Sequence, residues 1–217
     1  MEGEQIRKGD FNNMKSRWNK EEMLRRLQQH KKIAAVKCPK AIEKALANKE
    51  DIAAVFLLMG SIMNVKRYVD LFQNEGIPVL IHAEKIGGLL LNSEGLDFIA
   101  NYVKPFGIVT TKPALIKKAK ERNLFVVQRV FMIDSEVYGN VLDSKQKPTP
   151  DIIEIMPATL YGVIRSYSEL LDIPVITGGL LSTPEHVRAS LEAGALAIST
   201  SNEALWAENF SAVELLR

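Results

Sequence analysis

The chain has 217 residues, of which 47% are hydrophobic and 25% charged, and its formal net charge is +2 at pH 7. This length suits one large domain, and no apolar run approaches the roughly 20 residues that a membrane-spanning helix needs. The start of the sequence is charged, and the single Cys38 cannot form an internal disulfide. We therefore expect a cytoplasmic protein, and the near-neutral charge does not by itself indicate nucleic-acid binding.

The first part of the chain lacks the pattern of a packed element. Residues 1–18 show no hydrophobic periodicity and are rich in Gly, Asp and Asn, which predicts a flexible tail. Met14 is a candidate natural start, in which case residues 1–13 are an added leader. An amphipathic helix is predicted at 21–31, of the kind that covers one end of a barrel. The folded domain is then expected to span residues 19–217.

The rest of the chain alternates between apolar runs and helical patterns. The predicted strands cover residues 33–37, 53–59, 78–83, 106–111, 125–133, 152–156, 174–177 and 197–200. The predicted helices cover residues 39–48, 64–75, 89–103, 113–123, 135–144, 160–171, 184–193 and 203–216. The strands are continuous apolar runs, which is typical of parallel strands buried on both faces.

Eight such repeats predict an α/β protein with a single-domain (β/α)8 TIM barrel. An open doubly wound sheet is the alternative, and its dinucleotide-binding form would carry a G-x-G-x-x-G motif after the first strand. Residues 36–40, Val-Lys-Cys-Pro-Lys, contain nothing of this kind. We predict neither a metal nor an organic cofactor from the sequence.

Two strand ends are rich in small and hydroxylated residues. The seventh predicted strand ends at Gly178 and Gly179, and the eighth ends at Thr200 and Ser201. In (β/α)8 barrels the loops after strands seven and eight often hold phosphate, because glycine lets main-chain N–H groups approach an oxyanion. Glycine pairs also serve ordinary turns. We favour the phosphate interpretation and take a phosphorylated small molecule as the first ligand to consider.

Other polar residues near predicted strand ends are candidates for the same site. His82 and Glu84 share one strand face and could serve proton transfer or a metal, while a hydrogen-bonded polar strand end is the structural alternative, which we favour. Glu154 lies among apolar residues and needs a partner, for which Arg129 and Lys112 are candidates. Two roles are open for Glu154. It forms a structural ion pair in the core, or its carboxylate binds ligand hydroxyls. Lys112 either reaches an anion above the barrel or is an exposed loop lysine.

Several of these segments together resemble the glycerol-uptake operon antiterminator regulatory proteins. The likeness runs from about residue 33 to 209, and it is most specific in Gln-Arg-x-Phe-x-x-Asp-Ser and Ser-Asn-x-x-Leu-Trp. The segments that carry it are 78–84, 106–112, 127–135, 152–157, 177–180 and 195–202, with Leu205 and Trp206.

The resemblance implies a barrel that senses glycerol 3-phosphate and acts on leader mRNA, so that transcription reads through a terminator. The role is regulatory and not catalytic. By this likeness the residues at the two strand ends, Gly178, Gly179, Thr200 and Ser201, would hold the phosphate. His82, Arg129 and Glu154 would face the glycerol part.

The chain departs from the family pattern at several strand ends. The differences fall at Lys37, Cys38, Glu84, Lys85 and Lys112. Because these differences lie at strand ends, they leave the identity of the effector open and affect the predicted fold less.

RNA binding is expected from the resemblance, with an excess of basic residues in 1–32 as local support. A solvated basic face is the alternative for that excess, and a homodimer is compatible with the role. The rival class is a TIM-barrel enzyme that acts on a small phosphorylated sugar or polyol. In that case Glu154 or Glu84 would be the base, and Lys112 or Arg129 the electrophile.

Overall fold

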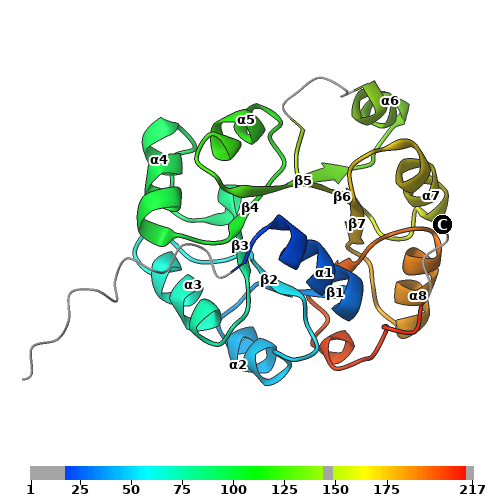
Figure 1. Ribbon diagram of the computed structural model, residues 1–217, viewed down its shortest axis with the longest axis horizontal. Coiled ribbons are helices and arrows are strands. Elements are labelled where there is room, and N and C mark those ends of the chain that lie inside the picture. Colours follow the sequence, from blue (N-terminus) through cyan, green and yellow to red (C-terminus); the bar gives the residue numbers. More distant parts are fainter. Residues whose placement is uncertain (1–17, 144–148, 214–217) are drawn as a thin grey trace, which may run out of the picture.

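The computed structural model describes residues 18–143 and 149–213. It shows a closed barrel of parallel strands with helices between them, which confirms the predicted (β/α)8 TIM barrel (Figure 1). The strands are β1 (Lys32–Val36), β2 (Ala54–Leu57), β3 (Val79–His82), β4 (Gly107–Thr110), β5 (Phe125–Phe131), β6 (Ile152–Met156), β7 (Val175–Gly178) and β8 (Ile198–Thr200). They pair in sequence order, and β8 returns to pair with β1.

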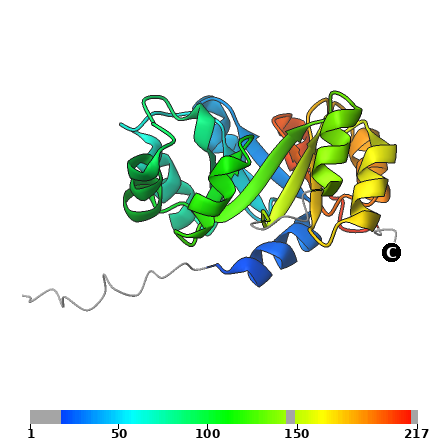
Figure 2. The same cartoon turned by 90° about the horizontal axis from the view of Figure 1, so that it is seen from above.

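Helices surround the barrel on its outer face, and one further helix, α1 (Lys20–His30), lies across one end (Figures 1 and 2). The outer helices are α2 (Lys40–Ala47), α3 (Val65–Asn74), α4 (Ser93–Asp97), α5 (Ala114–Lys120), α6 (Ser135–Asp143), α7 (Tyr161–Leu170) and α8 (Pro184–Glu192). Short 3-10 turns form η2 (Ala83–Lys85) and η4 (Glu203–Trp206), and α4 continues as the π-helical η3 (Phe98–Val103). No helix in the described ranges is long and apolar enough to cross a membrane.

Alternate strand residues pack on opposite faces of the barrel wall. Ile33 and Phe56 belong to the cluster that fills the barrel interior, whereas Ala34 and Val55 pack between the strands and the outer helices. Because side chains alternate along a strand, this arrangement needs apolar residues at successive positions. This arrangement explains the continuous apolar runs in the sequence. Along each strand, the inward-facing residues continue to the carboxyl end of the strand.

Helix α1 closes the end of the barrel at which the strands begin (Figure 2). It starts after Asn19, whose side chain accepts a hydrogen bond from the N–H of Glu22 at 2.8 Å, as an N-cap residue does. Met23 and Leu27 are buried in the barrel-interior cluster. The amphipathic helix predicted at 21–31 is therefore present, and its apolar face seals the interior.

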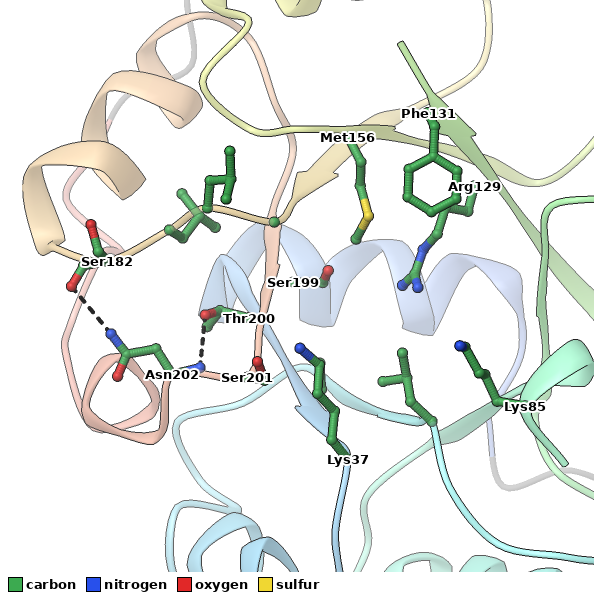
Figure 3. A pocket seen from close by; sticks show the side chains of 15 residues that line it. Lys37, Lys85, Arg129, Phe131, Met156, Ser182, Ser199, Thr200, Ser201 and Asn202 are labelled. Carbon is green, nitrogen blue, oxygen red and sulfur yellow. Dashed lines mark hydrogen bonds between the residues drawn. The ribbon is translucent and has the colours of Figure 1, made fainter. Parts of the chain in front are cut away.

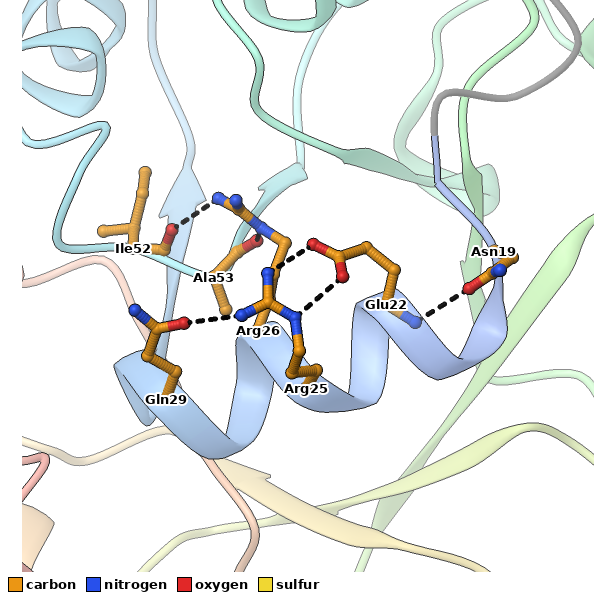
Figure 4. A network of polar contacts seen from close by, with 7 residues as sticks. All are labelled: Asn19, Glu22, Arg25, Arg26, Gln29, Ile52 and Ala53. Atoms are coloured by element: carbon orange, nitrogen blue, oxygen red, sulfur yellow. Dashed lines mark hydrogen bonds and ion pairs between the residues drawn. The ribbon is translucent and has the colours of Figure 1, made fainter.

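A polar network fixes α1 against the barrel (Figure 4). The guanidinium of Arg26 donates to the main-chain oxygens of Ala53 at 2.8 Å and Ile52 at 3.1 Å, just before β2. On the exposed side, Arg25 binds Glu22 through Nε at 2.8 Å. The contacts of Arg26 reach across 26 and 27 residues of sequence, so they hold the helix to a particular part of the barrel.

The predicted helix at 203–216 is wrong as far as the chain is described. Only the 3-10 turn η4 forms there, and the chain then continues without a helix to residue 213. Phe210 is buried, Lys32 Nζ donates to the main-chain oxygen of Glu208, and Asn209 accepts from the N–H of Ser211 at 2.9 Å. These side-chain bonds to the backbone compete with helix formation and stabilise a looped path instead. Residues 214–217 lie outside the described ranges.

The predicted helix at 89–103 begins later than expected. Asn92 accepts from the N–H of Gly95 at 2.9 Å, so α4 starts only at Ser93. The segment before α4 is held by a different contact, an isolated β-bridge between Gly87 and Ser61. Of the predicted N-terminal tail, residues 1–17 lie outside the described ranges, while Trp18 is buried and belongs to the packed domain.

Candidate functional site

A cavity of about 630 Å³ lies at the carboxyl ends of the strands (Figure 3). This is the end at which (β/α)8 barrels place their ligand sites. Among the residues that the structure describes, its lining includes cations, hydroxyl groups, an amide and apolar side chains, and no carboxylate. The lining residues are Ala35, Lys37, Leu58, Lys85, Arg129, Phe131, Met156, Gly179, Leu180, Leu181, Ser182, Ser199, Thr200, Ser201 and Asn202.

The strand periodicity explains how polar side chains reach this cavity. Val127 and Ile152 belong to the barrel-interior cluster, and the next residues on the same strand faces are Arg129 and Glu154. In the same way Lys37 follows the interior residue Ala35 by two positions on the path of β1. The inner face therefore changes from apolar to polar as each strand reaches its carboxyl end.

Arg129 and Glu154 form a buried ion pair at the base of the cavity. They are direct neighbours in the register of β5 and β6, and Nε lies 2.6 Å from Oε2, with side-chain exposures of 5% and 0%. Ser199 on β8 donates from Oγ to the other carboxylate oxygen of Glu154 at 2.5 Å. Arg129, and not Lys112, is thus the partner of Glu154. Removing one member of such a pair costs about 3–5 kcal/mol, because the other charge is left buried.

One nitrogen of this pair remains unsatisfied. Nη2 of Arg129 is buried and has no hydrogen-bond partner among the described residues. A guanidinium has five donors, and a buried donor without an acceptor costs free energy. Arg129 also lines the cavity, where Figure 3 shows its guanidinium facing the open space. An anion or a hydroxyl group in the cavity would satisfy the free N–H groups.

The end of β7 is built from glycines for two different steric reasons. A Cβ on Gly178 would collide with Oγ of Ser199 and lie 3.0 Å from Oε1 of Glu154. Gly179 has φ of +78°, in the left-handed region that favours glycine, and the nearest atom to an added Cβ there would be Sδ of Met156 at 3.9 Å. The backbone at Gly179 therefore borders the cavity without a side chain over it.

Hydrogen bonds join the loops that follow β7 and β8. The amide of Asn202 donates from Nδ2 to the main-chain oxygen of Ser182 at 3.2 Å, and its own N–H donates to Oγ1 of Thr200 at 3.0 Å (Figure 3). The main-chain oxygen of Thr200 accepts from Nε1 of the buried Trp206 at 2.9 Å. The segment Ser-Asn-x-x-Leu-Trp thus holds one wall of the cavity in a fixed shape.

His82 and Glu84 form a separate polar cluster outside the cavity lining. Nδ1 of His82 lies 3.1 Å from Oε2 of Glu84, whose other oxygen accepts from the N–H of Thr111 at 2.9 Å and from the hydroxyl of Thr110. Burial raises the pKa of Glu84, but the contacts with His82, Thr110 and Thr111 outweigh it and lower the pKa from 4.5 to about 2. Glu84 is therefore ionised and ties the end of β3 to the end of β4.

The remaining predicted residues separate into two groups. Arg129, Gly179, Thr200 and Ser201 line the cavity, while Glu154 and Gly178 lie directly behind it. Lys112 is exposed; its N–H donates to Oγ1 of Thr110 at 3.1 Å, and its main-chain oxygen accepts from the N–H of Leu115 at 3.0 Å. The binding role of each of these residues stays a prediction.

The sequence interpretation did not include two lysines of the cavity among its ligand-binding residues. Lys37 and Lys85 line the cavity, and Figure 3 shows both ammonium groups turned toward its centre. The interior register of β1 could have found Lys37, since it follows Ala35 by two positions. Lys85 lies in the 3-10 turn η2, where strand parity no longer applies and gives no signal.

Fold and cavity together define the class: a (β/α)8 barrel with a cation-lined cavity at the carboxyl ends of its strands. Residues 32–206 match the sequence profile of the glycerol-3-phosphate responsive antiterminators. The chain therefore belongs to the glycerol-3-phosphate responsive antiterminator family.

Individual relatives agree with this assignment. A glycerol uptake operon antiterminator regulatory protein from Listeria monocytogenes is 35% identical with a TM-score of 0.75, over 81% of this chain and 94% of that chain. An antiterminator-related protein from Thermotoga maritima is 28% identical with a TM-score of 0.71, over 81% and 96%. The uncharacterized protein YgcP of Escherichia coli is 29% identical over 184 residues, which are 85% of this chain and 95% of YgcP.

More distant barrels share the fold alone. A deoxyribose phosphate aldolase from Aeropyrum pernix has a TM-score of 0.62 over 85% of this chain and 94% of that chain, but its sequence identity is 13%. Because unrelated activities occur on this fold, the likeness does not carry a catalytic function to the chain.

Proposed function

We propose that the protein is a transcription antiterminator that binds glycerol 3-phosphate in the cavity and then acts on the leader mRNA of a glycerol-uptake operon. Its membership of the glycerol-3-phosphate responsive antiterminator family supports the regulatory role and the effector. The name of the Listeria relative supports the operon. A protein with this role acts in the cytoplasm, where the leader mRNA is made.

The phosphate is proposed to lie against the loops that follow β7 and β8. Gly179 and Ser201 line the cavity, and Lys37 adds a positive charge just after the neighbouring strand β1. The single observation that carries the proposal is this meeting of glycine backbone and cations in one cavity.

The glycerol part is proposed to face Arg129, whose free Nη2 would donate to a hydroxyl oxygen. Glu154 lies behind Arg129 and fixes its orientation, whereas His82 is buried at the end of β3, outside the cavity lining. Glu84 and Lys112 are left out of the proposed binding set, because neither lines the cavity. Glu84 is occupied by the end of β4 instead.

We favour a regulator over an enzyme because of the family. A sugar-phosphate isomerase needs a base beside the substrate, but among the described residues the cavity lining contains no carboxylate, and Glu154 behind it is held by Arg129 and Ser199. A Schiff-base aldolase needs a lysine instead, and Lys37 and Lys85 line the cavity, so an assay of turnover is needed to separate it from the regulator. Turnover of a small sugar phosphate in a coupled assay, lost in Glu154→Gln, would favour the enzyme over the regulator.

Calorimetry and transcription test the two parts of the proposal. Titration with glycerol 3-phosphate should show saturable binding, while glycerol, which lacks the phosphate, should bind far more weakly. In transcription from a template with the operon leader and terminator, read-through should require both the protein and glycerol 3-phosphate. Because an effector acts only through different affinities for two states, leader RNA should in turn raise effector affinity. Read-through that ignores the effector would contradict the proposal.

A further inference from the structure

The two sides of the barrel carry opposite charge, although the chain as a whole is nearly neutral. Residues 18–131, from the start of the described chain to the end of β5, contain 19 Lys or Arg and 11 Asp or Glu. Residues 132–143 and 149–213 contain two arginines and 11 Asp or Glu. Figure 1 shows α2 to α5 on one side of the ring and α6 to α8 on the other. A polyanion should therefore approach the side formed by α2 to α5.

Helix α5 is the most basic helix on that side. Among the α-helices of the described chain it alone contains no Asp or Glu, and three of its seven residues are Lys117, Lys118 and Lys120. Lys117 and Lys118 are exposed, and neither forms an ion pair with a described residue. The exposed Glu121, directly after the helix, is the one acidic residue next to them in the sequence. The ammonium groups of α5 therefore outnumber the nearby carboxylates and face the solvent.

The row of lysines continues beyond the ends of α5. Lys112 is exposed and follows β4, so it lies at the carboxyl ends of the strands, where the cavity also lies. At the other end of α5, Lys120 and Lys20 both contact Oδ1 of Asp151, at 2.8 Å and 3.3 Å, just before β6. Positive side chains thus extend from the cavity end of the barrel to the end that α1 covers. The helix between them is about 10 Å long at 1.5 Å per residue.

Helix stability does not explain the whole row. Cations in the last turn of a helix interact favourably with its dipole, which accounts for the three lysines of α5. Lys112 lies before the first turn, where the same dipole disfavours a cation. The N–H of the preceding Thr111 is held by Glu84 at 2.9 Å, and Lys85, next to Glu84, lines the cavity. The start of the row is therefore fixed to the cavity wall, and its charge has a cause other than the stability of α5.

We propose that leader mRNA binds along α5, with its phosphate groups against Lys112, Lys117 and Lys118. We call these three residues the α5 surface. An ammonium group contacts phosphate as a point charge, and such contacts position a nucleic acid without reading its bases. Residues 112–118 contain no aromatic side chain on which a base could stack, so this surface holds the RNA backbone only. The inference rests on the mRNA partner of the proposed function, and it gives that partner a position on the barrel.

Binding of the full chain to the operon leader RNA, measured by fluorescence anisotropy with saturating glycerol 3-phosphate, tests the α5 surface. The double variant Lys117→Gln, Lys118→Gln should bind on the order of tenfold more weakly at about 0.15 M salt. Its slope of log affinity against log salt should be shallower by about 1.4. Adding Lys112→Gln should weaken binding further. The matched control, Lys40→Gln with Lys44→Gln, removes two exposed lysines of α2 and should lose less than about threefold.

Both double variants should melt at the wild-type temperature and bind glycerol 3-phosphate with unchanged affinity, because neither pair of lysines lines the cavity. The α5 variant should show less transcription read-through, whereas the α2 variant should keep it. Equal weakening in the two variants would show a general attraction to the basic side, and unaffected RNA binding in the α5 variant would place the RNA elsewhere. Either result overturns the inference and leaves the proposed function intact. If the wild-type protein with effector binds no leader RNA, the mRNA part of the proposed function fails, and the inference fails with it.

Discussion

Gly179 combines a left-handed backbone with a position at the cavity wall. Gly179→Asp should abolish effector binding, because its carboxylate would repel the phosphate at close range. Asp tolerates positive φ better than most residues, so the variant should stay folded with a loss of about 1–2 kcal/mol in unfolding free energy. Calorimetry measures the affinity, and thermal melting checks the fold.

Gly179→Asn is the matched variant for this prediction. Asn has nearly the same size and backbone tolerance as Asp but carries no charge. It should therefore lose less affinity than Asp, and the difference between the two isolates the electrostatic repulsion. Unchanged affinity in Gly179→Asp would place the phosphate elsewhere in the molecule.

Glu84 should make the protein sensitive to acid. Its pKa in the folded protein is about 2, below the ordinary value of 4.5, so the ionised form stabilises the fold. This stabilisation is complete above about pH 4.5, and it is lost as the pH falls toward about 2. In Glu84→Gln the unfolding free energy should be lower at neutral pH by on the order of 2 kcal/mol, with a weaker pH dependence in that window.

Urea unfolding at several pH values measures this effect. Glu75→Gln serves as a control, because this exposed carboxylate pairs only with Lys49 at the surface. If wild type and Glu84→Gln lose stability in parallel between pH 4.5 and pH 2, the cluster with His82 and Thr110 does not stabilise the fold.

The sequence predicted some of the individual residues of the candidate site. Strand ends rich in glycine and hydroxyl groups were sufficient to indicate Gly179, Thr200 and Ser201, which line the cavity. The importance of Lys85 depends on the path of a 3-10 turn, and sequence periodicity does not describe such a turn. Glu84 was expected beside the ligand, whereas the structure places it against the N–H of Thr111, a partner 27 residues away.

Among the elements, α1 has the most specific packing role. Leu27 is 1% exposed and belongs to the barrel-interior cluster, so Leu27→Ala should lower the unfolding free energy by about 2–5 kcal/mol. Effector affinity should stay nearly unchanged, because α1 covers the end of the barrel opposite the cavity. Denaturant unfolding and calorimetry measure the two quantities.

The control for α1 is Arg25→Ala on the exposed side of the same helix. Its ion pair with Glu22 is at the surface and screened by solvent, so its loss should leave the unfolding free energy nearly unchanged. A strong loss of effector affinity in Leu27→Ala, with the fold intact, would show that the two ends of the barrel are coupled.

Strands were easier to predict than helix ends. Both faces of each strand are buried, and the resulting apolar runs marked all eight strands to within a few residues. Helix boundaries depend on side-chain contacts with the backbone, such as that of Asn92 with Gly95. After Trp206, the contacts of Lys32 and Phe210 depend on a distant part of the fold, and local periodicity could not reveal them.

As a whole, the barrel should respond to effector as one unit. The cavity is lined from β1, β5, β6 and β8 and from the segments after β1, β2, β3, β7 and β8, so a ligand there contacts most of the ring. At about 100 times the dissociation constant, a ligand specific for the folded state adds about 2.7 kcal/mol to the unfolding free energy. For a chain of this size that corresponds to a rise of roughly 5–10 °C in melting temperature.

Scanning calorimetry with and without glycerol 3-phosphate checks this prediction, and glycerol provides the matched control. The melting curve should shift as a single transition. A ligand that shifts only part of the curve would show that the two halves of the barrel unfold separately.

The return of β8 to β1 has a consequence for protein synthesis. One wall of the cavity comes from β8 and the loop behind it, and this strand can be hydrogen-bonded on both sides only after β1 and β7 are in place. While the ribosome still holds β8, the sheet of the nascent polypeptide is open, and the cavity lacks the wall that β8 and the following loop supply. A newly made copy should therefore begin to bind its ligand only after β8 has left the ribosome and paired with β1 and β7.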